Sequence, residues 1–122
     1  METDRKQFDL EERTYAFAKD VRGYIKKLPR TVANIEDARQ LVNASGSVGA
    51  NYIEANEALS KKDFLMRIKI CRKEAKESRF WLRLLYCNGE KSLETVRTAL
   101  IQESGELTSI FGAIFRKSEA TK

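Results

Sequence analysis

Apolar and small residues recur along the chain at intervals of three and four, which is the period of an amphipathic helix. In the first segment, Pro29 ends this pattern because it disfavours helical backbone at the residue before it. The pattern predicts a helix over residues 9–27. Its inward-facing positions are Leu10, Thr14, Phe17, Val21 and Tyr24, and Leu28 continues the same stripe directly after the helix.

A second helix is predicted over residues 35–58, with Asn34 as its N-cap. Residues 44–50 are small and would also suit a loop. The inward stripe keeps its phase through them, so a continuous helix is predicted, on which small residues let a neighbouring helix approach closely. The stripe consists of Ala38, Leu41, Ser45, Val48, Tyr52 and Ala55.

Two further helices are predicted over residues 61–87 and 92–116. Ser60 and Asp63 resemble a capping box at the start of the third helix, and Asn88-Gly89 stops it. The inward positions of the third helix are Phe64, Ile68, Cys71, Ala75, Ser78, Leu82 and Leu85. Those of the fourth are Leu93, Val96, Leu100, Leu107, Phe111 and Ile114.

Four amphipathic helices with short connections predict an all-α, antiparallel up-down four-helix bundle. The 122 residues form one domain, 1–122, with a single proline. No apolar run approaches the roughly 20 residues of a membrane span, and the polar start is not a signal peptide. We therefore expect a cytoplasmic protein that makes no contact with a membrane.

The composition argues against catalysis. Histidine is absent, which removes the commonest general base and the commonest metal ligand. Glu54/Glu57 and Glu74/Glu77 have a spacing used in di-iron bundles but lack the imidazole partner. No phosphate-binding loop motif is present. We expect no enzyme activity, no metal and no cofactor, and we expect these glutamates to pair with Lys and Arg side chains such as Lys73 and Arg79.

The two cysteines are not expected to form a disulfide. If Cys71 and Cys87 share a helix, they lie about 24 Å apart along it, and a disulfide needs Cα atoms within roughly 7 Å. Two free thiols are typical of a reducing cytosol.

The third predicted helix is strongly basic, with seven Lys or Arg residues between positions 67 and 83. The net charge of the chain is +5. A stripe of cations can follow nucleic-acid phosphates. A solvated helix face with ion pairs between successive turns is the alternative. The candidate nucleic-acid contacts, on the first and third helices, are Lys19, Arg22, Lys26, Lys69, Arg72, Lys76, Arg79 and Arg83.

The same helix has more apolar surface than one bundle can bury, which predicts a subunit interface. A wide core is the alternative. On the second helix, uncharged polar residues beside the core can hydrogen-bond across helices or subunits, and a small-ligand site around Asn51 and Glu54 is a further alternative. The candidate interface residues are Met66, Ile70, Phe80, Trp81, Leu84, Asn51 and Glu54.

Two stretches resemble a known family. Residues 44–55 (ASGSVGANYIEA) resemble the S-I-x-x-N-I-x-E-G signature of the bacterial four-helix bundle proteins encoded by 23S rRNA intervening sequences. Residues 76–85 (KESRFWLRLL) resemble the signature of the third helix in this family, and Phe8-Asp9-Leu10 and Leu28-Pro29 also fit. The resemblance covers residues 8–115. The glycine that follows the family's glutamate is Ala55 here, which makes a helix break at that point less favourable.

The resemblance implies a bundle that assembles into a homopentameric ring. The family is similar to the accessory variability determinant of diversity-generating retroelements, a pentameric barrel that binds nucleic acid and a reverse transcriptase. No catalytic residues are implied. The first hypothesis is therefore a non-enzymatic homo-oligomeric scaffold that binds structured RNA or DNA. The second is an accessory module that binds an acidic partner protein such as a reverse transcriptase.

Overall fold

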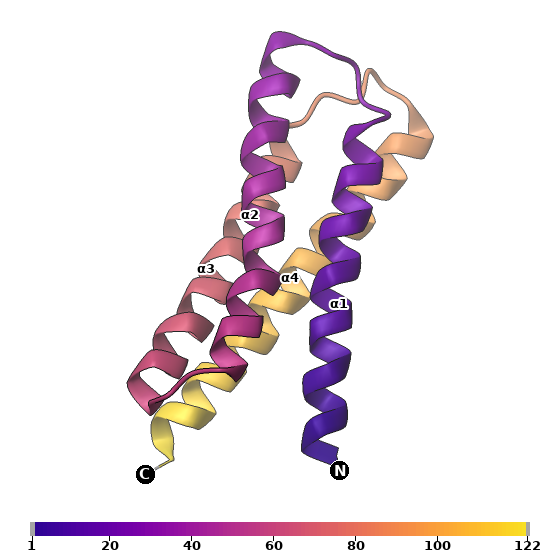
Figure 1. The fold of residues 1–122 in the computed structure, drawn as a ribbon. Coiled ribbons are helices and arrows are strands. Elements are labelled where there is room, and N and C mark those ends of the chain that lie inside the picture. The colour runs from indigo at the N-terminus through magenta and orange to yellow at the C-terminus, as the bar shows by residue number, and fades with distance from the viewer. Residues whose placement is uncertain (1, 122) are drawn as a thin grey trace.

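The computed structural model describes residues 2–121, with side chains from residue 9 onward. Over this range the chain forms four helices, α1 (Glu2–Ile25), α2 (Val32–Asn56), α3 (Lys61–Leu84) and α4 (Lys91–Ala120). They run alternately up and down, so that the start of α1 and the end of α4 lie at the same end (Figure 1). Each helix packs on the next and α4 also packs on α1, whereas α1 and α3 share no contact within this range. The all-α four-helix bundle is thereby confirmed.

The core follows the predicted stripes closely. All six positions from Leu10 to Leu28 are buried, and the rings of Tyr52 and Phe111 meet at its centre with centroids 5.7 Å apart. Val96 is an error of prediction, because 40% of it is exposed. The inner position is Arg97, whose guanidinium reaches the carbonyl oxygens of Leu82 and Leu85 at the end of α3.

The small residues of α2 lie within one continuous helix, as predicted. A Cβ atom on Gly49 would lie 2.9 Å from Thr14 Oγ1, which shows how closely α1 crosses α2. Gly46 provides room for the Arg22 guanidinium, since its Cβ would lie 3.4 Å from Arg22 Nη2. The helix continues through Ala55 and ends one residue later.

The start of α2 differs from the prediction. Thr31, not Asn34, is the N-cap, and its hydroxyl accepts a hydrogen bond from the Asn34 N–H. The Asn34 side chain is buried and joins the two connections at this end of the bundle. Its Nδ2 donates to the carbonyls of Pro29 and Tyr86, and its Oδ1 accepts from the Tyr86 N–H, each at 2.9 Å.

The end of α3 also differs. The helix ends at Leu84, three residues earlier than predicted, because extended backbone at Leu85 lets both Leu85 and Cys87 enter the core. Asn88 and Gly89 then adopt positive φ angles of 54° and 72° in the turn to α4. At the other end, Ser60 caps α3 as predicted, accepting from the Asp63 N–H at 3.0 Å.

Candidate nucleic-acid interface

The basic stripe of α3 lies along the boundary with α4. Its spacing of three and four residues keeps these side chains on one flank of the helix, and all of them are exposed. Facing them on α4 are two glycines seven residues apart, Gly105 and Gly112, which leave room between the helices. The stripe consists of Lys69, Arg72, Lys76, Arg79 and Arg83.

Two hollows lie along this boundary, which we call the α3–α4 groove. The first, of about 230 Å³, is lined by Lys69, Arg72, Gly112, Phe115 and Arg116. The second, of about 380 Å³, is lined by Lys76, Arg79, Phe80, Arg83, Gly105, Thr108 and Ser109. No carboxylate lines either hollow, so both present positive charge and hydrogen-bond donors to solvent.

The cations of α3 are not neutralised by ion pairs. Among side chains 9–121, pairs within 4.0 Å join Arg13 to Glu103 and Glu106, and Arg97 to Glu94, but none involves α3. The expected pairing of its glutamates with Lys73 and Arg79 is therefore wrong at this distance. The alternative to phosphate binding was a solvated face with ion pairs between successive turns. The described side chains of α3 form no such pair within 4.0 Å.

Glu74 instead lies near Ser47 of α2 and near Glu77. Burial, followed by the hydrogen bond and repulsion from Glu77, raises the pKa of Glu74 above its usual range. Glu74 is thus on the α2 side of α3, turned away from the groove. Glu77, in contrast, lines a hollow on the outer flank of α3 together with Lys69, Arg72 and Lys76 of the basic stripe.

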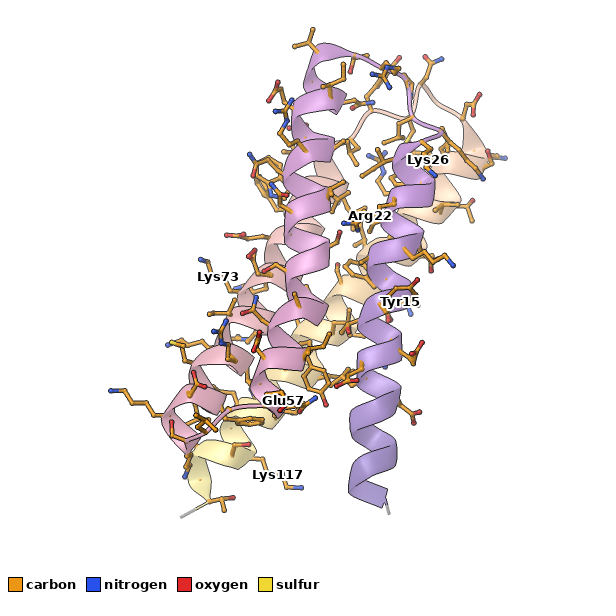
Figure 2. All side chains as sticks on the ribbon, in the orientation of Figure 1. Tyr15, Arg22, Lys26, Glu57, Lys73 and Lys117 are labelled. Atoms are coloured by element: carbon orange, nitrogen blue, oxygen red, sulfur yellow. The ribbon has the colours of Figure 1, made fainter. Side chains whose placement is uncertain are left out.

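The basic residues of α1 form a separate group. Arg22 donates to its own helix at Ala18 O and lies over Gly46, while Lys19 Nζ sits 6.0 Å from the centre of the Tyr15 ring. Arg22 and Lys26 appear on the α1–α2 side of the bundle in Figure 2, whereas Lys73 points outward from α3. Because α1 does not contact α3, the eight predicted residues fall on two different sides of one subunit.

An apolar stripe runs along the outward flank of α3, interrupted by Lys73 and Glu77. Met66, Phe80 and Leu84 are each about half exposed, at 49%, 53% and 50%. Ile70 is partly buried, and it lines with Met66 a hollow of about 540 Å³ whose other lining residues are the charged Lys69, Arg72, Lys73, Lys76 and Glu77. We call Met66, Ile70, Phe80 and Leu84 the apolar stripe.

The other three predicted interface residues have different surroundings. Trp81 packs against the core of its own subunit and meets the Phe80 ring edge-on, with centroids 4.9 Å apart. Asn51 joins α2 to α3, because its Oδ1 accepts from Arg67 Nη1 at 3.0 Å. Glu54 is exposed. Asn51 thus links α2 to α3 within one subunit.

The cysteine thiols face the interior. Cys71 and Cys87 are both free and buried, and Cys87 lies beyond the end of α3, so the two do not share a helix as was supposed. Burial raises the pKa of Cys71 to about 12. The Tyr24 hydroxyl and Cys87 Sγ lie 3.0 Å apart, and burial raises the pKa of this tyrosine as well. Within the described side chains, no group of three or more His, Cys, Asp or Glu residues is arranged to hold a metal ion.

The sequence pattern did not single out Gly112, Phe115 or Arg116 of α4. Gly112 is buried, and Cβ of a residue there would lie 3.3 Å from Arg116 Nη1 and 3.4 Å from Arg72 Nε. The sequence does place a glycine about one helical turn before an aromatic residue and a basic residue. This spacing identifies a site only once it is known which residues of α3 lie opposite.

Comparison with known proteins agrees with this architecture. The family model of the 23S rRNA-intervening sequence protein matches residues 6–110. A crystal structure of a protein of unknown function from the S23 ribosomal protein family of Bacteroides thetaiotaomicron superposes with a TM-score of 0.71. The two are 25% identical, and the likeness covers 86% of this chain and 96% of that one. The comparison with curated proteins gives no match.

Within residues 2–121, no helix is long and apolar enough to cross a bilayer. The family match spans most of the chain, including both of the stretches on which the resemblance was based. The chain therefore belongs to the 23S rRNA-intervening sequence protein family.

Proposed function

We propose that the protein is a non-enzymatic, homo-oligomeric scaffold that binds structured RNA through the α3–α4 groove. The observation that carries this proposal is the row of five exposed α3 cations without an ion-pair partner among the described side chains. Phosphates can neutralise such a row and release their counterions, which is the main source of affinity in nucleic-acid binding.

The apolar stripe supports the oligomeric part of the proposal. Exposed apolar side chains that follow one flank of a helix are typical of a subunit interface. The stripe lies next to the groove on the same helix, so each added subunit places another groove beside the first. Several weak grooves on one assembly then bind a single RNA with avidity. A pentameric ring, which the family resemblance implies, would be one such assembly.

A salt titration tests the RNA-binding part. With about six phosphate contacts, at roughly 0.7 to 0.9 per contact, the logarithm of the binding constant should fall against the logarithm of salt concentration with a slope of about −4 to −5. A gel-shift titration of an RNA hairpin at several salt concentrations measures this slope. Binding that is absent at low salt, or indifferent to salt, contradicts the proposal.

A pair of charge-matched variants tests the position of the site. Lys76→Gln/Arg79→Gln removes two charges from the groove, and Lys19→Gln/Arg22→Gln removes two from the α1–α2 side. We expect the first to weaken binding by at least tenfold and to reduce the salt slope by roughly two. The second should change both much less. Equal losses in the two variants would show that binding depends on net charge alone and not on the groove.

The alternative partner is an acidic protein that meets the same basic surface. Pull-down from a lysate with and without nuclease separates the two cases. A partner that is lost on nuclease treatment is held through RNA, whereas one that survives is bound directly. Retention after nuclease, together with no gel shift, would replace RNA by a protein as the partner.

A further inference from the structure

Three cationic side chains converge on the hollow at Gly112. Arg72 approaches from α3 and Arg116 from α4, and both place a guanidinium nitrogen within 3.4 Å of the point where a Cβ of residue 112 would lie. Lys69 lines the same hollow, with its Nζ 5.9 Å from the centre of the Phe115 ring. Two helices thus bring their positive charges to one spot, which the missing side chain of Gly112 keeps open.

This arrangement gives the hollow a local excess of positive charge, although solvent reaches all three side chains. The two guanidinium groups repel each other, no acidic side chain lines the hollow, and no ion pair engages either arginine among the described side chains. An anion placed between them converts the repulsion into two attractions. Guanidinium groups present a planar fork of donors that matches the oxygens of a phosphate in a bidentate manner.

We infer that the Gly112 hollow binds the terminal phosphate of an RNA strand, an inference that rests on the proposed RNA-binding function. A terminal phosphate carries roughly two negative charges and three acceptor oxygens. Arg72, Arg116 and Lys69 can each serve one of these oxygens. An internal phosphate carries one charge and has two free oxygens, so it leaves one of the three cations unmatched.

The rest of the groove gives such a strand a path. The second hollow begins at Lys76, about one helical turn or about 6 Å beyond Arg72 along α3, and continues to Arg83. It is the larger of the two and adds the hydroxyls of Thr108 and Ser109 as neutral donors. Phe115 stands beside the Gly112 hollow, where its ring can contact the terminal nucleoside. The end of the strand is held at Gly112 and its internal phosphates continue toward Arg83.

Matched RNA oligonucleotides test this inference. Fluorescence anisotropy compares one short sequence with a 5′-phosphate, with a 3′-phosphate and with hydroxyls at both ends. We expect a phosphate on at least one end to strengthen binding by about tenfold, as charge-assisted bidentate contacts do. Equal affinity for all three forms would overturn the inference and leave the proposed function standing.

Variants assign the preference to the hollow. Arg116→Gln removes one of the converging cations, and Gly112→Ala inserts a methyl group that only displaces the flexible ends of two arginines, so both should fold. Each should lose most of the preference for a phosphorylated end, so that its affinity for phosphorylated RNA falls by a larger factor than its affinity for hydroxyl-ended RNA. Gly23→Ala on α1, where an added Cβ meets nothing within 4 Å, is the control and should retain the preference. A preference that survives in both groove variants would refute this location.

A small probe separates failure of the inference from failure of the proposed function. In NMR titrations, a dinucleotide phosphorylated at the 5′ end or at the 3′ end, whichever the oligonucleotides prefer, should shift the Gly112 backbone amide, and its hydroxyl-ended form should not. The absence of this shift overturns the inference, whatever longer RNA does. If adenosine 5′-monophosphate binds the hollow as tightly as the phosphorylated RNA, the site belongs to a free nucleotide and the RNA-end assignment is overturned.

Discussion

At the scale of single residues, two glycines within helices have opposite environments. Gly49 lies where α1 crosses α2, and Gly23 faces open space. Gly49→Ala must push Thr14 away, so we expect a net loss of about 1–2 kcal/mol in the free energy of unfolding, as in other overpacked cores. Gly23→Ala should instead gain up to about 1 kcal/mol from helix propensity. Urea unfolding of both variants measures the contrast, and a stabilised Gly49→Ala would show that the helices do not cross so closely.

Glu74 provides a residue-scale prediction about pH. The folded protein holds the Glu74 proton to a higher pH than the unfolded chain, because burial and Glu77 raise the pKa. Ionisation therefore lowers stability as the pH rises above about 4.3, the value in an unfolded chain. Glu74→Gln stays neutral and should be more stable than the parent at pH 7, by roughly 0.2–0.5 kcal/mol for a like-charged helical pair.

This advantage should vanish near pH 3–4, where the parent glutamate is also protonated. Urea midpoints across this pH range provide the measurement. Glu12→Gln, at an exposed position of α1, is the control and should show no such gain at neutral pH. A Glu74→Gln advantage that is independent of pH would indicate a packing effect and not a charge effect.

At the scale of helices and their connections, Asn34 holds one end of the bundle together. Its amide satisfies backbone groups of both the α1–α2 and the α3–α4 connections. Asn34→Ala removes the hydrogen-bond partner of three part-buried backbone groups of Pro29 and Tyr86, so we expect a loss of about 1–3 kcal/mol in the free energy of unfolding. Asn43→Ala, at an exposed position of the same helix, is the matched control. Chemical denaturation decides the matter, and similar stabilities of the two variants would mean that water replaces the Asn34 amide.

The helices show where sequence periodicity is informative and where it stops. Spacing of three and four residues identified nearly all of the core, because burial on a helix depends on local phase. It failed at Arg97, a charged residue that a hydrophobic pattern does not place inside. Its long side chain crosses to the carbonyl oxygens at the end of α3. It also failed at Asn34, whose partner Tyr86 lies 52 residues away.

The candidate site was predictable in part for the same reason. The stripe of α3 is local and was found, whereas the approach of Arg72 to Arg116 depends on the register between α3 and α4. The separation of the α1 cations from the α3 cations is likewise a property of helix order around the bundle, in which α1 and α3 lie diagonally. The spacing of residues along the sequence predicts which face of each helix is buried, but it does not predict which helices pack together or in what register.

At the scale of the whole molecule, the apolar stripe makes a prediction about assembly. Each subunit has a mass of 14.0 kDa, and burial of half-exposed Met66, Phe80 and Leu84 between subunits would remove most of the apolar surface of α3 from water. We expect light scattering to give a multiple of this mass. Met66→Gln/Leu84→Gln replaces both ends of the stripe while leaving Phe80 and the cations in place, and it should shift the mass toward 14.0 kDa.

Tyr15→Gln is the matched control, because this exposed aromatic lies on α1, which does not contact α3 within the subunit. It should keep the parent mass. If the parent protein is monomeric, the apolar stripe is not a subunit interface, and avidity no longer contributes to the proposed RNA binding. A monomeric stripe variant that also binds RNA more weakly than the parent, with its groove cations intact, would show that RNA binding depends on several grooves acting together.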